Sequence, residues 1–131
     1  MVVVIDSNKT FNDTDGCILT ALIISGRSST LKDIVFVSNT INHDIISFEG
    51  LNQGLSRLES EGFIRYKNGR IFISKKTKDF DKKNKKRFES CIDMKQRYSN
   101  IIKNLMLNNE IQYKQYFSID EYIKVVNILT K

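Results

Sequence analysis

The feature that most constrains the fold of this chain is the pair Asn68-Gly69, which lies between two runs of alternating apolar and polar residues. A two-residue type I′ turn requires positive φ at both central positions, and Asn and Gly tolerate that conformation better than other residues do. The flanking runs, 63–67 and 70–74, have the period of two that is typical of strands. The sequence therefore predicts a β-hairpin over residues 63–74.

Pairing outward from this turn assigns the side chains of the hairpin to two faces. The face expected to lie against the core carries Ile64, Tyr66, Ile71 and Ile73. The opposite face carries Arg65, Lys67, Arg70 and Phe72. Like charges that lie opposite each other on paired strands repel, and an anion such as phosphate would relieve the repulsion between Lys67 and Arg70. The alternative is a solvated basic hairpin that only keeps the protein soluble.

Three helices are predicted before the hairpin. The first is expected over the apolar stretch 13–25, and the second runs from a Thr30 cap to Ile41. The third covers residues 48–61, with Ser47 as its cap. Its inward positions, spaced by three or four residues, are Phe48, Leu51, Leu55 and Leu58. Its outward positions are Glu49, Asn52, Gln53, Ser56, Arg57, Glu59 and Ser60.

The net charge of +6 is concentrated in one part of the chain. Residues 63–87 contain 11 basic and 2 acidic residues, which gives this stretch +9 and leaves −3 for all the rest. A solvated charge run is the ordinary explanation of such a stretch, but here the run adjoins the hairpin. A continuous positive surface of this kind favours an anionic partner, nucleic acid above all.

The remainder of the chain is expected to be mostly helical. Residues 75–87 are expected to form a lysine-dense connector, followed by a long helix with an apolar stripe over 88–107. A last helix begins at Ser118, which forms a capping box with Glu121. Two parts are therefore predicted: a domain over 1–76, and a helical extension over 77–131 that either folds back or pairs with a second copy. At the other end, residues 1–6 are expected to be an edge strand or an arm.

The segment from Leu55 to Ile64, which reads Leu-Ser-Arg-Leu-Glu-Ser-Glu-Gly-Phe-Ile, is similar to the junction between recognition helix and wing in bacterial regulators of the MarR and PadR groups. With three helices before it and the hairpin after it, the chain resembles the winged-helix fold over residues 13–75. The fold class that follows is mainly α with one β-hairpin: a winged helix-turn-helix followed by a long and a short helix.

The resemblance implies a DNA-binding transcriptional regulator that contacts double-stranded DNA and acts as a homodimer. Helix 48–61 would be the recognition helix, with Asn52, Gln53, Ser56 and Arg57 facing the major groove. The wing over 63–74 and the residues after it would contact phosphates through Arg65, Lys67, Asn68, Arg70, Lys75 and Lys76. The alternative is a protein-interaction module, in which the acidic helix 48–61 and the C-terminal helices bind a protein partner.

Several function classes are disfavoured by the residues present. One histidine, His43, and two distant cysteines, Cys17 and Cys91, do not form a zinc-site spacing, and both cysteines are expected to be buried. No general acid, base or nucleophile cluster and no phosphate-binding glycine loop is recognisable, so we expect no enzyme and no cofactor. No apolar run approaches the ~20 residues of a membrane span, and no signal peptide is recognisable, so a cytoplasmic location is expected.

Overall fold

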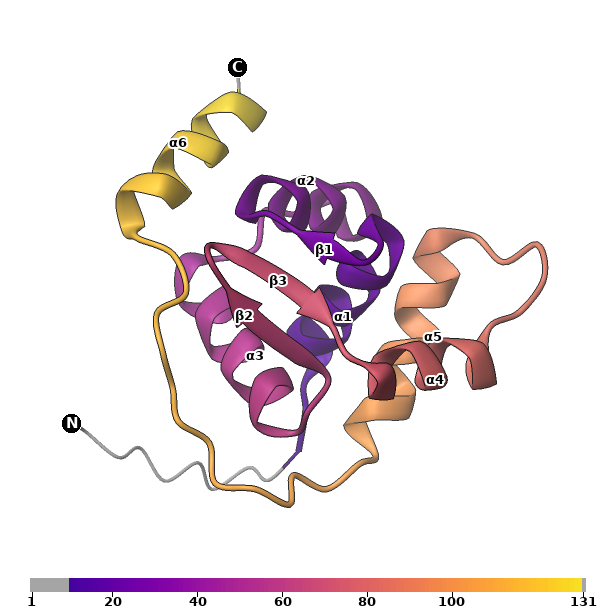
Figure 1. Cartoon of the computed structure of the whole chain (residues 1–131). Coiled ribbons are helices and arrows are strands. Elements are labelled where there is room, and N and C mark those ends of the chain that lie inside the picture. Colours follow the sequence, from indigo (N-terminus) through magenta and orange to yellow (C-terminus); the bar gives the residue numbers. More distant parts are fainter. Residues whose placement is uncertain (1–9, 131) are drawn as a thin grey trace.

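The computed structural model describes residues 10–130 and shows a mainly α-helical protein with one small antiparallel sheet (Figure 1). In chain order the elements are α1 (Asp13–Ser25), β1 (Ser28–Ser29), α2 (Leu31–Asn42), α3 (Phe48–Ser60), β2 (Ile64–Lys67), β3 (Arg70–Ile73), α4 (Lys75–Asn84), α5 (Cys91–Lys103) and α6 (Ile119–Leu129). The class predicted from the sequence, mainly α with a β-hairpin, is confirmed. The edge strand or arm expected at residues 1–6 lies outside the described residues.

The hairpin has the predicted register. Strands β2 and β3 pair Lys67 with Arg70, Tyr66 with Ile71, Arg65 with Phe72, and Ile64 with Ile73. The turn residues Asn68 and Gly69 have φ of 51° and 75°, as a type I′ turn requires. The short strand β1, which was not predicted, pairs with the other edge of β3 and completes a sheet of order β1-β3-β2.

The helices begin where polar side chains can satisfy their first backbone amides. Asn12 caps α1 and exchanges hydrogen bonds with Asp15, one residue before the predicted cluster begins. The predicted Thr30, Ser47 and Ser118 caps of α2, α3 and α6 are all confirmed. These caps are local signals, so they could be identified without knowledge of the tertiary structure.

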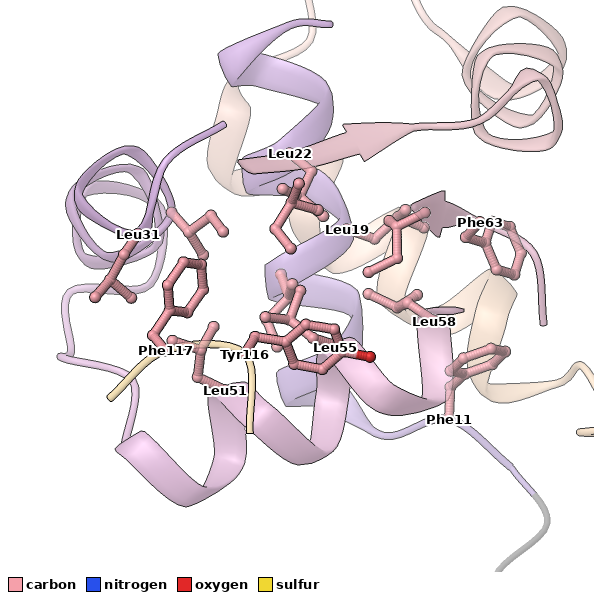
Figure 2. Close-up of a cluster of buried hydrophobic side chains, with 14 of the residues drawn as sticks. Phe11, Leu19, Leu22, Leu31, Leu51, Leu55, Leu58, Phe63, Tyr116 and Phe117 are labelled. Carbon is pink, nitrogen blue, oxygen red and sulfur yellow. The ribbon is translucent and has the colours of Figure 1, made fainter. Parts of the chain in front are cut away.

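The core is built around α1, which is buried without interruption from Asp15 to Leu22. The helices α2, α3 and α5 pack around it, and one apolar cluster joins them to the inner face of the hairpin (Figure 2). A Cβ on Gly54 would come within 2.8 Å of the Asp15 carboxylate and would also overlap Ile18, so α1 and α3 approach closely there. Residues from both sides of the boundary expected at residue 76 belong to this one cluster.

The segment after the hairpin differs from the prediction. The expected connector over 75–87 is helical as far as Asn84, because Ser74 caps α4 and the Thr77 hydroxyl donates a hydrogen bond to the Phe63 carbonyl at 2.5 Å. The expected long helix is shorter, since α5 ends at Lys103 and buries only Tyr98, Ser99 and Ile102. The first half of its predicted apolar stripe, which consists of Phe88, Cys91 and Ile92, is exposed, so the prediction of a buried Cys91 is wrong.

Beyond α5 the chain is extended rather than helical until α6. We call residues 105–117 the covering segment, because they run along α3 on the way to α6 (Figure 1). Leu107, Tyr116 and Phe117 of this segment are buried in the main apolar cluster. Figure 2 shows the rings of Tyr116 and Phe117 beside Leu51 and Leu55 of α3. The C-terminal part of the chain therefore folds back on the body, one of the two arrangements predicted for it.

Candidate nucleic-acid interface

The outer face of the hairpin presents the cations that the alternation predicted. Arg65, Lys67 and Arg70 are all exposed, as is the turn residue Asn68. The Arg70 guanidinium donates hydrogen bonds to the Ser28 hydroxyl at 3.1 and 3.3 Å, which links the hairpin tip to β1. Lys67 and Arg70 are cross-strand partners, so two basic residues lie opposite each other at the tip, with the Arg70 guanidinium directed to β1. The hairpin thus offers a cationic surface that a phosphate group would complement.

Helix α4 continues the positive charge beyond the end of β3 (Figure 1). Its inward positions, which are buried or half-buried, are Thr77, Phe80, Asp81 and Asn84. The opposite side carries Lys75, Lys78 and Lys82, all exposed and spaced by three and four residues. At a rise of 3.3 Å per strand residue, the step from Arg70 to Lys75 spans at most about 16 Å. The cations of α4 therefore follow closely in the chain after those of the hairpin.

Two lysines at the start of α4 have partners within the protein. The Lys76 ammonium donates to the Glu61 carbonyl at 2.6 Å and lies 4.5 Å from the centre of the Phe63 ring. The Lys75 ammonium lies 4.0 Å from the Asp79 carboxylate, an exposed pair of one helical turn that contributes little. Lys76 is exposed, but its ammonium group binds the junction between α3 and β2.

The face of α3 that was predicted to read DNA bases is covered by the chain itself. The backbone amide of Tyr116 donates to the Asn52 side-chain oxygen at 2.8 Å, and that of Lys114 donates to the Ser56 hydroxyl at 2.9 Å. Asn52 and Ser56 are 7% and 1% exposed. The prediction that these two side chains face outward is wrong, because they satisfy backbone groups of the covering segment.

Arg57 has a buried partner on α1. Its guanidinium donates to both oxygens of the Asp15 carboxylate, at 2.7 and 2.9 Å, and the Asp15 side chain is fully buried. Burial disfavours the charged guanidinium, but the hydrogen bonds and charge of Asp15 outweigh that effect and raise the pKa of Arg57. Tyr113 of the covering segment adds a further contact at 3.4 Å. Arg57 is 6% exposed, so the prediction that it faces outward is also wrong.

Glu59 of α3 and its C-cap Glu61 have the same role as Asn52 and Ser56. The Glu61 carboxylate accepts hydrogen bonds from the backbone amides of Asn108 and Asn109. The Glu59 carboxylate accepts from the Tyr116 hydroxyl at 2.9 Å and pairs with the Lys114 ammonium at 2.5 Å. Burial, together with this bond to Glu59, raises the pKa of the Tyr116 hydroxyl. These carboxylates hold the covering segment and do not face a DNA groove.

Of the four residues predicted to read bases, Gln53 alone remains exposed. Its amide lies 3.3 Å from the carboxylate of Glu49, also exposed. One amide beside one carboxylate is a poor counterpart to the anionic groove of a duplex. The candidate interface therefore consists of the hairpin and α4 rather than α3.

Two parts of this arrangement were missed in the sequence. The helical stripe that Lys78 and Lys82 form with the predicted contact Lys75 could have been found, since Ser74 is a good cap and Thr77, Phe80, Asp81 and Asn84 have helical spacing. The covering segment gave only a weak signal, the adjacent aromatic residues Tyr116 and Phe117 at the end of a stretch of mixed polar and apolar residues. Tyr66 of β2, expected in the core, is 40% exposed and contacts both of these rings edge to face.

Comparisons of this chain with models of protein families, with curated proteins and with solved structures find no match. Over residues 10–130, no helix is both long and apolar enough to cross a membrane. In that same part of the chain, no three His, Cys, Asp or Glu side chains come together in a way that could hold a metal ion.

Proposed function

We propose that this chain is a DNA-binding protein of winged-helix type that contacts the phosphate backbone of double-stranded DNA through the hairpin and α4. The observation that carries the proposal is the row of exposed cations on these two elements: Arg65, Lys67, Arg70, Lys75, Lys78 and Lys82. The order of three helices followed by a hairpin with a basic tip supports the winged-helix assignment. A role in transcriptional regulation is part of the same proposal.

The covered face of α3 decides what kind of DNA contact the proposal includes. Exposing this face would return Leu107, Tyr116 and Phe117 to water, at a cost of about 1.5–3 kcal/mol for each side chain. Non-specific DNA binding supplies only about 5–8 kcal/mol at physiological salt. Uncovering α3 would offset most of that free energy. The proposed complex therefore keeps the covering segment in place and relies on phosphate contacts, which position a protein without reading sequence.

The proposal is tested by neutralising single cations and measuring the fluorescence anisotropy of a labelled mixed-sequence duplex of about 30 base pairs. The variants Lys67→Gln, Lys78→Gln and Lys82→Gln should each weaken binding and reduce the salt slope of the affinity by about 1. Lys124→Gln is the matched control, because Lys124 is an exposed lysine on α6 and its loss changes the net charge equally. The control should bind as the unmodified protein does.

The protein-interaction module is the competing function, and the same titration separates the two. If the unmodified protein does not bind the duplex at low salt and tens of micromolar protein, phosphate contact is excluded and a protein partner becomes the better explanation. Equal losses in Lys124→Gln and the three surface variants would show that only overall charge matters, which would also contradict the proposed interface.

The homodimer expected from the sequence remains a proposal. On α6, Ile119, Ile123 and Ile128 are each about half exposed, so this helix has apolar surface to offer a second copy. Light scattering at tens of micromolar protein should give twice the 15.2-kDa mass of the chain. A mass of one chain would contradict it.

A further inference from the structure

The loop between α4 and α5 presents a phenylalanine that the fold does not use. Phe88 is 97% exposed, far more than any other large apolar side chain in residues 10–130. Its φ is 60°, in the left-handed region that residues with a Cβ avoid. An exposed aromatic ring and a left-handed backbone both oppose stability, so folding alone does not account for this residue.

The residue after Phe88 anchors the loop to α5. The adjacent Glu89 carboxylate accepts two hydrogen bonds from the Arg97 guanidinium of α5, at 2.6 and 2.7 Å. Arg97 lies 5.0 Å from the centre of the Tyr98 ring, and the Tyr98 hydroxyl donates to Asp81 of α4 at 2.6 Å. These contacts connect the end of the loop to both helices that flank it. Anchoring the loop at Glu89 reduces the backbone freedom that is lost when Phe88 binds a partner.

The residues before Phe88 indicate the charge of that partner. Five of the six preceding residues are cationic: Lys82, Lys83, Lys85, Lys86 and Arg87. The Arg87 guanidinium lies 5.4 Å from the centre of the Phe88 ring. In Figure 1 the loop lies beyond α4, at the end of this helix that is away from the hairpin. A partner that fits this surface carries regularly spaced negative charges together with flat apolar groups.

We propose that Phe88 stacks on a nucleobase of the DNA that the hairpin and α4 hold by its phosphates. This inference rests on the proposed function and adds a contact to the bases. Phenylalanine rings stack on the bases of single strands, and apolar side chains enter base steps of duplexes as wedges. The chemistry is the same for a base in a duplex and for an unpaired base. The cations around the ring would hold the flanking phosphates.

The test replaces Phe88 by a fluorescent aromatic residue. The chain contains no tryptophan, so Phe88→Trp introduces a single reporter at the tip of the loop. Titration with a mixed-sequence duplex of about 30 base pairs, and separately with one of its strands, should quench the Trp emission as the ring stacks. Quenching by the duplex indicates a wedge in a base step, and quenching by the single strand alone indicates an unpaired base. The control is Met106→Trp, because Met106 is 62% exposed in the covering segment, away from the hairpin, α4 and the α4–α5 loop, and its reporter should not respond.

A second variant separates loss of the ring from loss of the loop conformation. Phe88→Asn removes the aromatic group but keeps a residue that tolerates positive φ. Its affinity for the DNA form that quenches the reporter should fall by about 5- to 150-fold, the range of a single stacking contact. Its salt slope should equal that of the unmodified protein, since no cation has been removed.

The outcomes distinguish failure of this inference from failure of the proposed function. Salt-dependent DNA binding with unchanged Trp emission, or with full affinity in Phe88→Asn, overturns the stacking contact and leaves the phosphate contacts intact. An absence of any DNA binding overturns both. A blue shift of the Phe88→Trp emission on vesicles of phosphatidylcholine and phosphatidylglycerol, without a response to DNA, overturns both in favour of an anionic membrane surface.

Discussion

The pair formed by Asp15 and Arg57 allows a sharp test of how α3 is used. Replacing Arg57 with Met would leave the Asp15 carboxylate buried without its cation, because the Asp15 side chain has no exposure to water. Removing one partner of a buried ion pair costs about 3–5 kcal/mol. That is a large part of the ~7–20 kcal/mol expected for the unfolding of a chain of this length. Arg57→Met should therefore remain folded but with a much lower free energy of unfolding.

Urea denaturation followed by circular dichroism measures this change. The double variant Asp15→Asn with Arg57→Gln should lose less than the sum of Asp15→Asn and Arg57→Gln, because each single variant strands a buried partner and the double variant strands neither charge. A loss below 1 kcal/mol in Arg57→Met, or additive losses in this double-mutant cycle, would refute the reasoning.

The Arg57→Gln variant distinguishes a structural arginine from one that reads bases. A base-reading Arg57 would contribute about 1–3 kcal/mol of discrimination between DNA sequences. In the structure its guanidinium is bound to Asp15, so Arg57→Gln should bind duplex DNA with unchanged affinity wherever the variant is folded. A tenfold loss of affinity by folded Arg57→Gln would show that the arginine reaches DNA after all.

Three further predictions follow from the packing of α3, the covering segment and the α4–α5 loop. Gly54→Ala should lower the free energy of unfolding by about 1–3 kcal/mol, since its Cβ would overlap Ile18 and Asp15. Gly50→Ala is the control: its Cβ would meet only the Ser47 side chain and the Thr14 methyl, so it should be close to neutral in the same urea titration. Phe117→Ala should lower the free energy of unfolding by about 3–5 kcal/mol, and a loss under 1 kcal/mol would contradict the packing of the covering segment on α3. Arg97 holds the pKa of Glu89 below its usual value of 4.5, so the stability difference between the unmodified protein and Glu89→Gln should be present at pH 6 and should disappear as the pH falls through that lowered pKa. A difference that persists at pH 2 would mean that the carboxylate is not the source of the effect.

The local parts of this fold could be predicted because short stretches of sequence determine them. Asn68-Gly69 permits one turn geometry, and that turn fixes the register of β2 and β3. The Thr30 and Ser118 caps are determined within four residues. The exposed cations of the hairpin follow from the same alternation, so that half of the candidate interface was also predictable.

The role of α3 could not be predicted, because contacts about 50 to 65 residues away determine it. Asn52, Ser56 and Glu61 look like an ordinary polar helix face until the backbone amides of Tyr116, Lys114 and Asn109 are placed against them. No local pattern distinguishes a side chain that binds a nucleobase from one that binds the backbone of its own chain. The exposed Phe88 was missed for the opposite reason, since helical spacing assigned it to a stripe that the tertiary structure leaves in solvent.

The salt dependence of duplex binding by the unmodified protein tests the central claim most directly. If the exposed cations Arg65, Lys67, Arg70, Lys75, Lys78 and Lys82 each contact a phosphate, the logarithm of the association constant should fall linearly with the logarithm of salt concentration, with a slope of about −5. Affinity would then drop about 10³-fold between 50 and 200 mM salt. An affinity that does not change with salt, or no binding at 50 mM salt and tens of micromolar protein, would contradict DNA binding by the hairpin and α4.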